Sequence, residues 1–135
     1  MLRLQLIDIG GLNLSAADAG EQIKHDGFSA TCEQADGLVL VVPEYNHAYP
    51  GMLKHVLDSN LKEYIHKAAD ICGVSAGGLG GTRVIQSLLP VLRELRLVTI
   101  FWDDNFSGAQ ALFDETGNMK DRATHEKRLE NFSAS

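Results

Sequence analysis

The feature that most constrains the fold is a run of five aliphatic residues, Leu38 to Val42, that ends at Pro43. A short, continuous apolar run of this kind is typical of a strand buried on both faces of a parallel sheet. Pro43 ends the strand because its ring fixes φ and removes the backbone donor. A polar turn with one aromatic residue follows, from Glu44 to Asn46. Ligands of open α/β sheets bind beyond the carboxyl ends of strands, so this turn is the first candidate site.

Strand and helix patterns alternate along the rest of the chain. The sequence predicts further strands over residues 4–9, 68–74 and 97–102, and helices near 28–34, 50–61, 82–95 and 121–132. Such alternation indicates an α/β fold, a doubly wound parallel sheet with helices on both faces. We expect Thr82 to cap the third helix. The length of 135 residues favours a single domain spanning residues 1–135.

The composition argues against several classes of function. The formal net charge is −6 and the basic residues are scattered, which argues against binding to a nucleic-acid backbone. No apolar run approaches the ~20 residues of a membrane span. Because the N-terminus shows no signal-peptide pattern, we expect a cytoplasmic protein with Cys32 and Cys72 reduced. The five histidines have no metal-ligand spacing, so we expect no metal site.

Two loops are expected to lie side by side. Right-handed crossovers bring consecutive strand–helix loops to the same edge of a sheet, so the turn 43–46 should neighbour the glycine-rich loop 75–81. The first loop offers backbone donors beside Tyr45. The second offers glycines, which let a ligand approach the main chain closely. Together they suit a planar ring system with hydrogen-bonding groups.

Three motifs resemble one enzyme family. They are Val-Pro-Glu-Tyr-Asn-His at 42–47, Gly-Val-Ser-Ala-Gly-Gly at 73–78 with Gly-Thr-Arg at 81–83, and Phe-Asp-Glu-Thr-Gly-Asn at 113–118. Through them the chain resembles the NADPH-dependent FMN reductase family, which has a flavodoxin-like fold. The similarity runs from about residue 2 to the end of the chain.

The resemblance implies an oxidoreductase that uses FMN, with NAD(P)H as the electron donor. The electron acceptor would be a small molecule: a quinone, free flavin, an azo compound or a metal oxyanion. The cofactor carries the redox chemistry, so we nominate no catalytic side chain. The resemblance also implies a homodimer or homotetramer, with Met52, Val56 and Leu57 as contact candidates. The residues implied to contact FMN are Pro43, Glu44, Tyr45, Asn46, Ser75, Ala76, Gly77 and Gly78.

The chain departs from the family pattern at its start. Family members begin with a strand and a loop that holds the FMN phosphate at a helix N-terminus. This chain starts in what resembles the family's second strand, and Ser15 and Lys24 would replace that loop poorly. The strand 38–42 would then have an unpaired edge. The segment 4–9 could slide over to it, another subunit could cover it, or the chain could be an incomplete version of a longer protein, which we favour.

A smaller departure concerns the end of the third helix. Arg96 stands where glycine is usual, so a left-handed, non-glycine residue is expected there.

Two other functions stay open. Gly73 to Gly77 reads G-x-S-x-G, the nucleophile elbow of α/β-hydrolases, and Ser75, Asp103 or Asp104, and His125 follow the triad order of that class. Against this, an elbow turns immediately into its helix, whereas here the glycine-rich segment 77–81 intervenes. The third reading is a non-catalytic, degenerate flavodoxin-like subunit with impaired FMN binding, which the missing phosphate loop supports.

Overall fold

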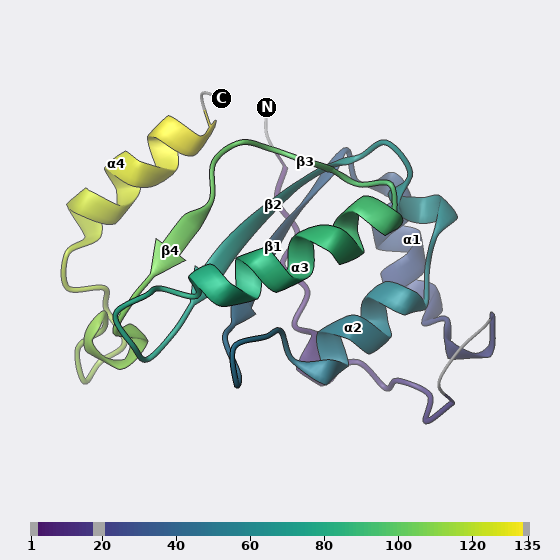
Figure 1. Cartoon of the computed structure of the whole chain (residues 1–135), viewed down its shortest axis with the longest axis horizontal. Helices are drawn as coiled ribbons and strands as arrows, with labels where there is room; N and C mark the ends of the chain where they lie inside the picture. The colour runs from purple at the N-terminus through teal and green to yellow at the C-terminus, as the bar shows by residue number, and fades with distance from the viewer. Residues whose placement is uncertain (1–2, 18–20, 134–135) are drawn as a thin grey trace.

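The computed structural model describes residues 3–17 and 21–133 (Figure 1). All strand pairs in these residues are parallel, and helices connect the main strands, so the predicted α/β alternation is confirmed. The strands are β1 (Gly37–Pro43), β2 (Ala68–Val74), β3 (Val98–Thr99) and β4 (Asp104–Phe106). The helices are α1 (Asp26–Gln34), α2 (Gly51–Asp58), α3 (Thr82–Glu94) and α4 (Arg122–Ser133), and 3₁₀ turns include η1 (Ile9–Gly11), η3 (Lys62–Tyr64) and η4 (Ala109–Ala111).

β2 is the central strand of the sheet. It pairs with β1 along its whole length, from Gly37 opposite Ala68 to Pro43 opposite Val74. Its other side pairs first with β3 and then with β4. The predicted strand 97–102 is therefore wrong as a single element. Two residues of β2, Asp70 and Ile71, lie opposite four residues, 100–103, and this excess forms a bulge that separates β3 from β4.

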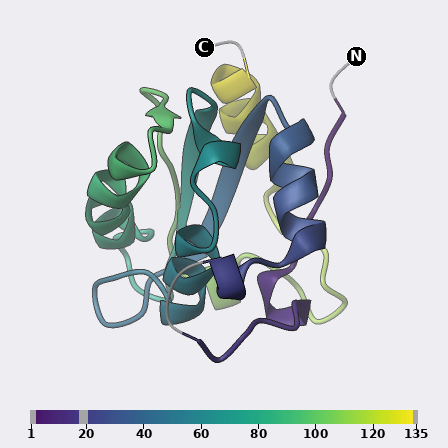
Figure 2. The same cartoon turned by 90° about the vertical axis from the view of Figure 1, so that its right-hand side faces the viewer.

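The predicted N-terminal strand is also wrong. Residues 4–8 are irregular and pair with no strand, and Leu4 and Leu6 are 80% and 94% exposed. The segment runs beside α1 (Figure 2), where Gln5 Nε2 donates to Thr31 Oγ1 over 3.4 Å. An alternating apolar pattern forms a strand only where a ladder partner is in reach, and here α1 is the neighbour. The segment therefore does not slide onto the edge of β1.

The core lies on one face of the sheet. Side chains alternate along a strand, so Leu38, Leu40 and Val42 share this face with Ala69 and Ile71. Helices α1, α2 and α3 cover it, and Tyr64 of η3 fills the space between them. The buried helical residues of this cluster are Cys32, Leu53, Leu57, Val84, Ile85, Leu88 and Leu92.

Two residues expected at a subunit contact belong to this interior. Val56 and Leu57 are each 1% exposed, because the apolar side of α2 faces the sheet. They are not available to another subunit in this structure. Met52, at the start of the same helix, is exposed.

The opposite face of the sheet is largely uncovered. Val39, Val41 and Val98 point to it and are 54%, 66% and 59% exposed. Of the described helices, α4 meets this face at its β4 end, where Arg128 Nη2 lies 2.8 Å from Asp104 Oδ1. Helices therefore lie on both faces, as predicted. The expectation that Leu38–Val42 is buried on both faces is wrong, because no described helix covers Val39 and Val41.

Candidate functional site

The first loop is a tight turn that projects beyond β1. Tyr45 and Ala48 exchange both backbone hydrogen bonds, at 2.9 and 3.0 Å. The two residues between them, Asn46 and His47, have φ values of 49° and 67°. Positive φ at both central residues defines a type I′ turn. Tyr45 is 62% exposed. In the described parts of the chain, the amides of Asn46 and His47 have no protein partner.

The second loop follows β2 and is fixed by the chain beyond β4. Ser75 N donates to Phe106 O over 3.0 Å, and Ala109 N donates to Ser75 O over the same distance. Gly108 N donates to Gly77 O over 3.2 Å. The amides of Ala76, Gly77 and Gly78 have no partner among the described residues. A rigid row of backbone donors results.

The glycines of this loop divide into two groups. A Cβ on Gly77 or Gly78 would meet no atom within 4 Å, so the surface above them is open. Gly81 has φ +80°, and a Cβ there would lie 2.6 Å from Val74 N. Gly81 is therefore required for close packing against β2, whereas Gly77 and Gly78 leave room for a ligand.

Glu44 joins the two loops. Its amide donates to Val74 O over 2.8 Å, at the end of β2. Its carboxylate Oε2 accepts from Arg83 N over 3.2 Å, and Oε1 lies 3.7 Å from Arg83 Nη1. The prediction that the two loops are neighbours is confirmed. The sequence did not reveal that the Glu44 side chain makes this link, because the partners are far apart along the chain.

The prediction that Thr82 caps α3 is wrong. Thr82 is the first helical residue, and its hydroxyl donates to Leu79 O over 2.7 Å. The N-cap is Gly81, which offers no side chain because its Cβ position is filled by backbone. The Glu44 carboxylate takes the place of a local capping group.

These loops suit the ring of a flavin. Free amides at 46–47 and 76–78 can donate to the carbonyl oxygens and ring nitrogens of a flat heterocycle. The open surface over Gly77 and Gly78 and the exposed ring of Tyr45 leave space for its faces. The arrangement supplies positioning and hydrogen bonds from the main chain.

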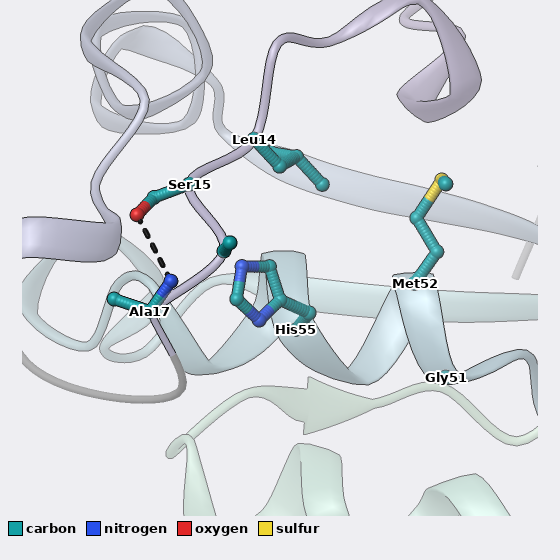
Figure 3. Close-up of a pocket in the computed structure, with 7 residues that line it drawn as sticks. Leu14, Ser15, Ala17, Gly51, Met52 and His55 are labelled. Carbon is teal, nitrogen blue, oxygen red and sulfur yellow. Dashed lines mark hydrogen bonds between the residues drawn. The ribbon is translucent and has the colours of Figure 1, made fainter.

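The two substitutes considered for the phosphate loop have other partners. Ser15 Oγ accepts from Ala17 N over 3.1 Å, and Lys24 Nζ lies 3.0 Å from Glu63 Oε1. Ser15 and Ala17 line a shallow pocket of about 360 Å³ at the start of α2, together with Leu14, Ala16, Gly51, Met52 and His55 (Figure 3). The pocket has no Lys or Arg in its lining, so it offers little to a phosphate.

The serine triad is not assembled. Ser75 Oγ donates to Gly77 O over 3.0 Å, and Asp104 pairs with Arg128. The ring of His125 stacks on Phe106, with centroids 5.4 Å apart. In the described residues no hydrogen bond links Ser75, Asp103, Asp104 or His125 to one another. Moreover α3 starts only at Thr82, whereas an elbow turns directly into its helix.

A buried acidic group escaped the sequence interpretation. Asp70 lies inside β2 at 4% exposure, and burial raises its pKa to about 6. Its neighbour Cys72 is a buried thiol, with its pKa raised by burial to about 12. A lone aspartate within the otherwise apolar run 68–74 was the signal that could have identified Asp70.

No helix in the described parts of the chain has the length and apolar character needed to cross a bilayer.

The chain is similar to known flavin-dependent reductases. The model of the NADPH-dependent FMN reductase family matches residues 2–106. A quinone reductase of Pseudomonas putida is 26% identical over 130 residues, which cover 90% of this chain and 70% of the relative. A 2-hydroxy-1,4-benzoquinone reductase of a Burkholderia species is 37% identical over 90 residues, 62% of this chain and 49% of the relative.

A solved structure agrees with these relatives. FerB, a flavoenzyme NAD(P)H:(acceptor) oxidoreductase from Paracoccus denitrificans, superposes with a TM-score of 0.72 and 25% sequence identity. The superposition covers 95% of this chain and 74% of FerB.

Proposed function

Because this chain belongs to the NADPH-dependent FMN reductase family and has its flavodoxin-like fold, we propose that it is an FMN-dependent NAD(P)H oxidoreductase that reduces a quinone. The family uses FMN and NAD(P)H. The quinone is the acceptor named for two of the relatives, and free flavin, azo compounds and metal oxyanions are the other acceptors to test. The observation that carries the proposal is the adjacency of the two donor-bearing loops, linked through Glu44.

We assign different roles to the eight proposed FMN residues. Pro43 has no amide hydrogen, and the amides of Glu44, Tyr45 and Ser75 already donate to Val74, Ala48 and Phe106. The amides available to the ring are therefore those of Asn46, Ala76, Gly77 and Gly78, together with His47, which the sequence interpretation did not include. Tyr45 contributes its exposed ring, and Pro43 and Glu44 fix the shape of the turn.

When bound, FMN would supply the redox chemistry between NAD(P)H and the acceptor. The part of this chain is to place and orient the ring. The fixed amides of the two loops would stabilise negative charge on a reduced ring, without reorganisation of the main chain. The glycine surface at 77–78 lets the ring approach the main chain.

A glycine substitution tests this assignment. Gly77→Leu keeps the backbone, because a Cβ there meets nothing within 4 Å, but its side chain would fill the ring position. We expect FMN affinity, followed by quenching of flavin fluorescence, to fall by about tenfold or more, which is ~1.4 kcal/mol. Quinone-dependent oxidation of NAD(P)H should fall with it.

Gly11→Leu is the matched control. A Cβ at Gly11 also meets nothing within 4 Å, and Gly11 belongs to η1, outside both loops. This variant should bind FMN as the unmodified chain does. Equal affinity of the Gly77→Leu variant and the unmodified chain would contradict the site, and an unmodified chain that fails to bind FMN would contradict the function.

A non-catalytic flavodoxin-like subunit is the second candidate. It is favoured by the partners of Ser15 and Lys24: Ser15 Oγ accepts from Ala17 N, and Lys24 Nζ pairs with Glu63, so neither side chain is placed as a phosphate ligand. The same FMN titration separates the two candidates, since this one predicts a colourless protein that cannot be reconstituted.

We also propose a cytoplasmic location and assembly into a homodimer or homotetramer. The uncovered valines of β1 support contact with another copy. Sedimentation analysis and cell fractionation test these two points.

A further inference from the structure

Glu44 occupies the junction of the two loops proposed to hold the flavin. Its amide extends the β1–β2 ladder by one residue beyond the pair Pro43 and Val74. Its carboxylate then crosses the end of β2 to the first turn of α3. The carboxylate is 10% exposed, so water screens it weakly.

Helix α3 depends on this carboxylate for its cap. Arg83 N is the second amide of the helix, the position that a local N-cap side chain commonly serves. Gly81 cannot be replaced by Ser, Asp or Asn, since a Cβ would overlap Gly73 and Val74. The cap therefore comes from 39 residues earlier in the chain. A carboxylate at this end also interacts favourably with the helix dipole.

We propose that Glu44 is the positioning residue of the flavin site: its carboxylate fixes the turn 43–48 relative to the loop 75–81 and, by its charge, lowers the reduction potential of the bound flavin. This inference rests on the proposed function. The capping bond fixes how far the free amides of 46–47 lie from those of 76–78. A ring that bonds to both groups needs that spacing held constant.

The charges of Glu44 and Arg83 should change the reduction potential of the flavin in opposite directions. Reduction adds negative charge to the ring, so the negative charge of Glu44 opposes reduction and the positive charge of Arg83 favours it. Neutralising Glu44 should raise the potential, and neutralising Arg83 should lower it. If Glu44 and Arg83 had only a structural role, their substitutions should not change the reduction potential in opposite directions.

Three substitutions separate the capping bond from the charge. Glu44→Gln keeps an oxygen that can accept from Arg83 N but removes the charge. Glu44→Ala removes both. Arg83→Gln removes the opposite charge while keeping the main-chain donor.

His25→Ala is the matched control. His25 Nδ1 accepts from Phe28 N over 3.2 Å and caps α1, a bond of the same kind that lies outside both loops. FMN affinity and the midpoint potential of the holoprotein are measured at a temperature where circular dichroism shows every variant folded.

Each variant has a stated outcome. Glu44→Gln should bind FMN within about threefold of the unmodified chain, and Glu44→Ala should bind about tenfold more weakly, as expected for the loss of a helix cap. His25→Ala should lower the melting temperature and leave FMN affinity unchanged. The potential should rise in Glu44→Gln and fall in Arg83→Gln.

Three results would overturn the inference while the proposed function stands. They are unchanged FMN affinity in Glu44→Ala, equal losses in Glu44→Gln and Glu44→Ala, and displacement of the potential in the same direction by Glu44→Gln and Arg83→Gln. The second of these would indicate that the carboxylate binds FMN directly. Failure of the unmodified chain to bind FMN would instead reject the proposed function itself.

Discussion

At the scale of single residues, Asp70 couples folding to pH. Burial is the main cause of its raised pKa, about 6, and the nearby carboxylates of Asp103 and Asp104 add to it. Its Oδ1 is buried without a hydrogen-bond partner among the described residues. The Cys72 thiol donates to Oδ2 over 3.8 Å, and the backbone amide of Ile71 also stabilises the carboxylate, so these two contacts offset burial only in part. The charged form is therefore less favourable in the folded protein than in the unfolded chain.

The sign of the pH dependence follows from this shift. The folded-state pKa lies above the ordinary value of 3.8, so the contribution of Asp70 is most favourable below that value and is lost as the pH rises through about 6. Asp70→Asn removes the titration. At pH 7 this variant should be more stable than the unmodified chain by about 1–3 kcal/mol.

Urea unfolding at several pH values checks the Asp70 prediction. Between pH 4 and pH 6 the unmodified chain should lose unfolding free energy relative to the Asp70→Asn variant. The prediction is wrong if the difference between the two proteins does not change over this interval.

At the scale of elements, the end of α3 carries identifiable strain. Leu97 N donates to Leu92 O and Arg96 N to Arg93 O, both over 3.0 Å. This pair of bonds is a Schellman motif with Arg96 at the left-handed position, and its φ of 61° confirms the prediction from the sequence. Arg96→Gly should raise the free energy of unfolding by about 0.5–1 kcal/mol, since glycine adopts this conformation without a steric penalty.

Thermal or urea unfolding measures the Arg96 effect. Arg96→Ala is the control, because it removes the same side chain but keeps the Cβ that makes positive φ unfavourable. A gain of equal size in both variants would show that the side chain, and not the backbone conformation, limits stability.

The elements also show what could be read from the sequence. β2 has the predicted bounds, because a run that is apolar except for Asp70 and lies between polar residues marks a central strand well. The prediction of a strand at 4–9 was wrong because an alternating pattern does not indicate whether a partner strand is in reach. The predicted strand 97–102 is divided because the four residues 100–103 lie opposite only two residues of β2. The sequence of this segment alone does not determine how it pairs with β2, so the division could not be predicted.

The candidate site could be predicted only in part, because local motifs and chain topology are visible in the sequence and long-range side-chain contacts are not. The adjacency of the loops followed from crossover handedness, and the turn residues from their motif. The cap on α3 was not predictable, because Glu44 and Arg83 are 39 residues apart and nothing local marks their contact. The same holds for the bonds that fix Ser75 to Phe106 and Ala109.

At the scale of the whole molecule, the two faces of the sheet differ in character. The core and α1 to α3 occupy one face, and the other exposes Val39, Val41 and Val98 beside a β1 edge that has no partner in the described residues. Exposed edges with apolar side chains promote association. Val41→Lys should therefore reduce light scattering and self-association at high concentration while the fold is kept, since Val41 is already largely exposed.

Leu61→Lys is the control for Val41→Lys. Leu61 is a half-exposed apolar residue outside the sheet, so the substitution changes net charge and surface apolarity in the same way. Equal suppression of association by both variants would mean that net charge, and not the uncovered face, governs self-association.

The long-range cap of α3 has a consequence for protein engineering. If the turn 43–48 alone is grafted onto another scaffold, the Glu44 carboxylate is moved without the Arg83 amide that it accepts from. If the loop 75–81 and α3 are grafted without the turn, the Arg83 amide in the first turn of the helix loses its acceptor. The turn 43–48 and the loop 75–81 with α3 should therefore be transferred together, both in grafts and in chimaeras between relatives.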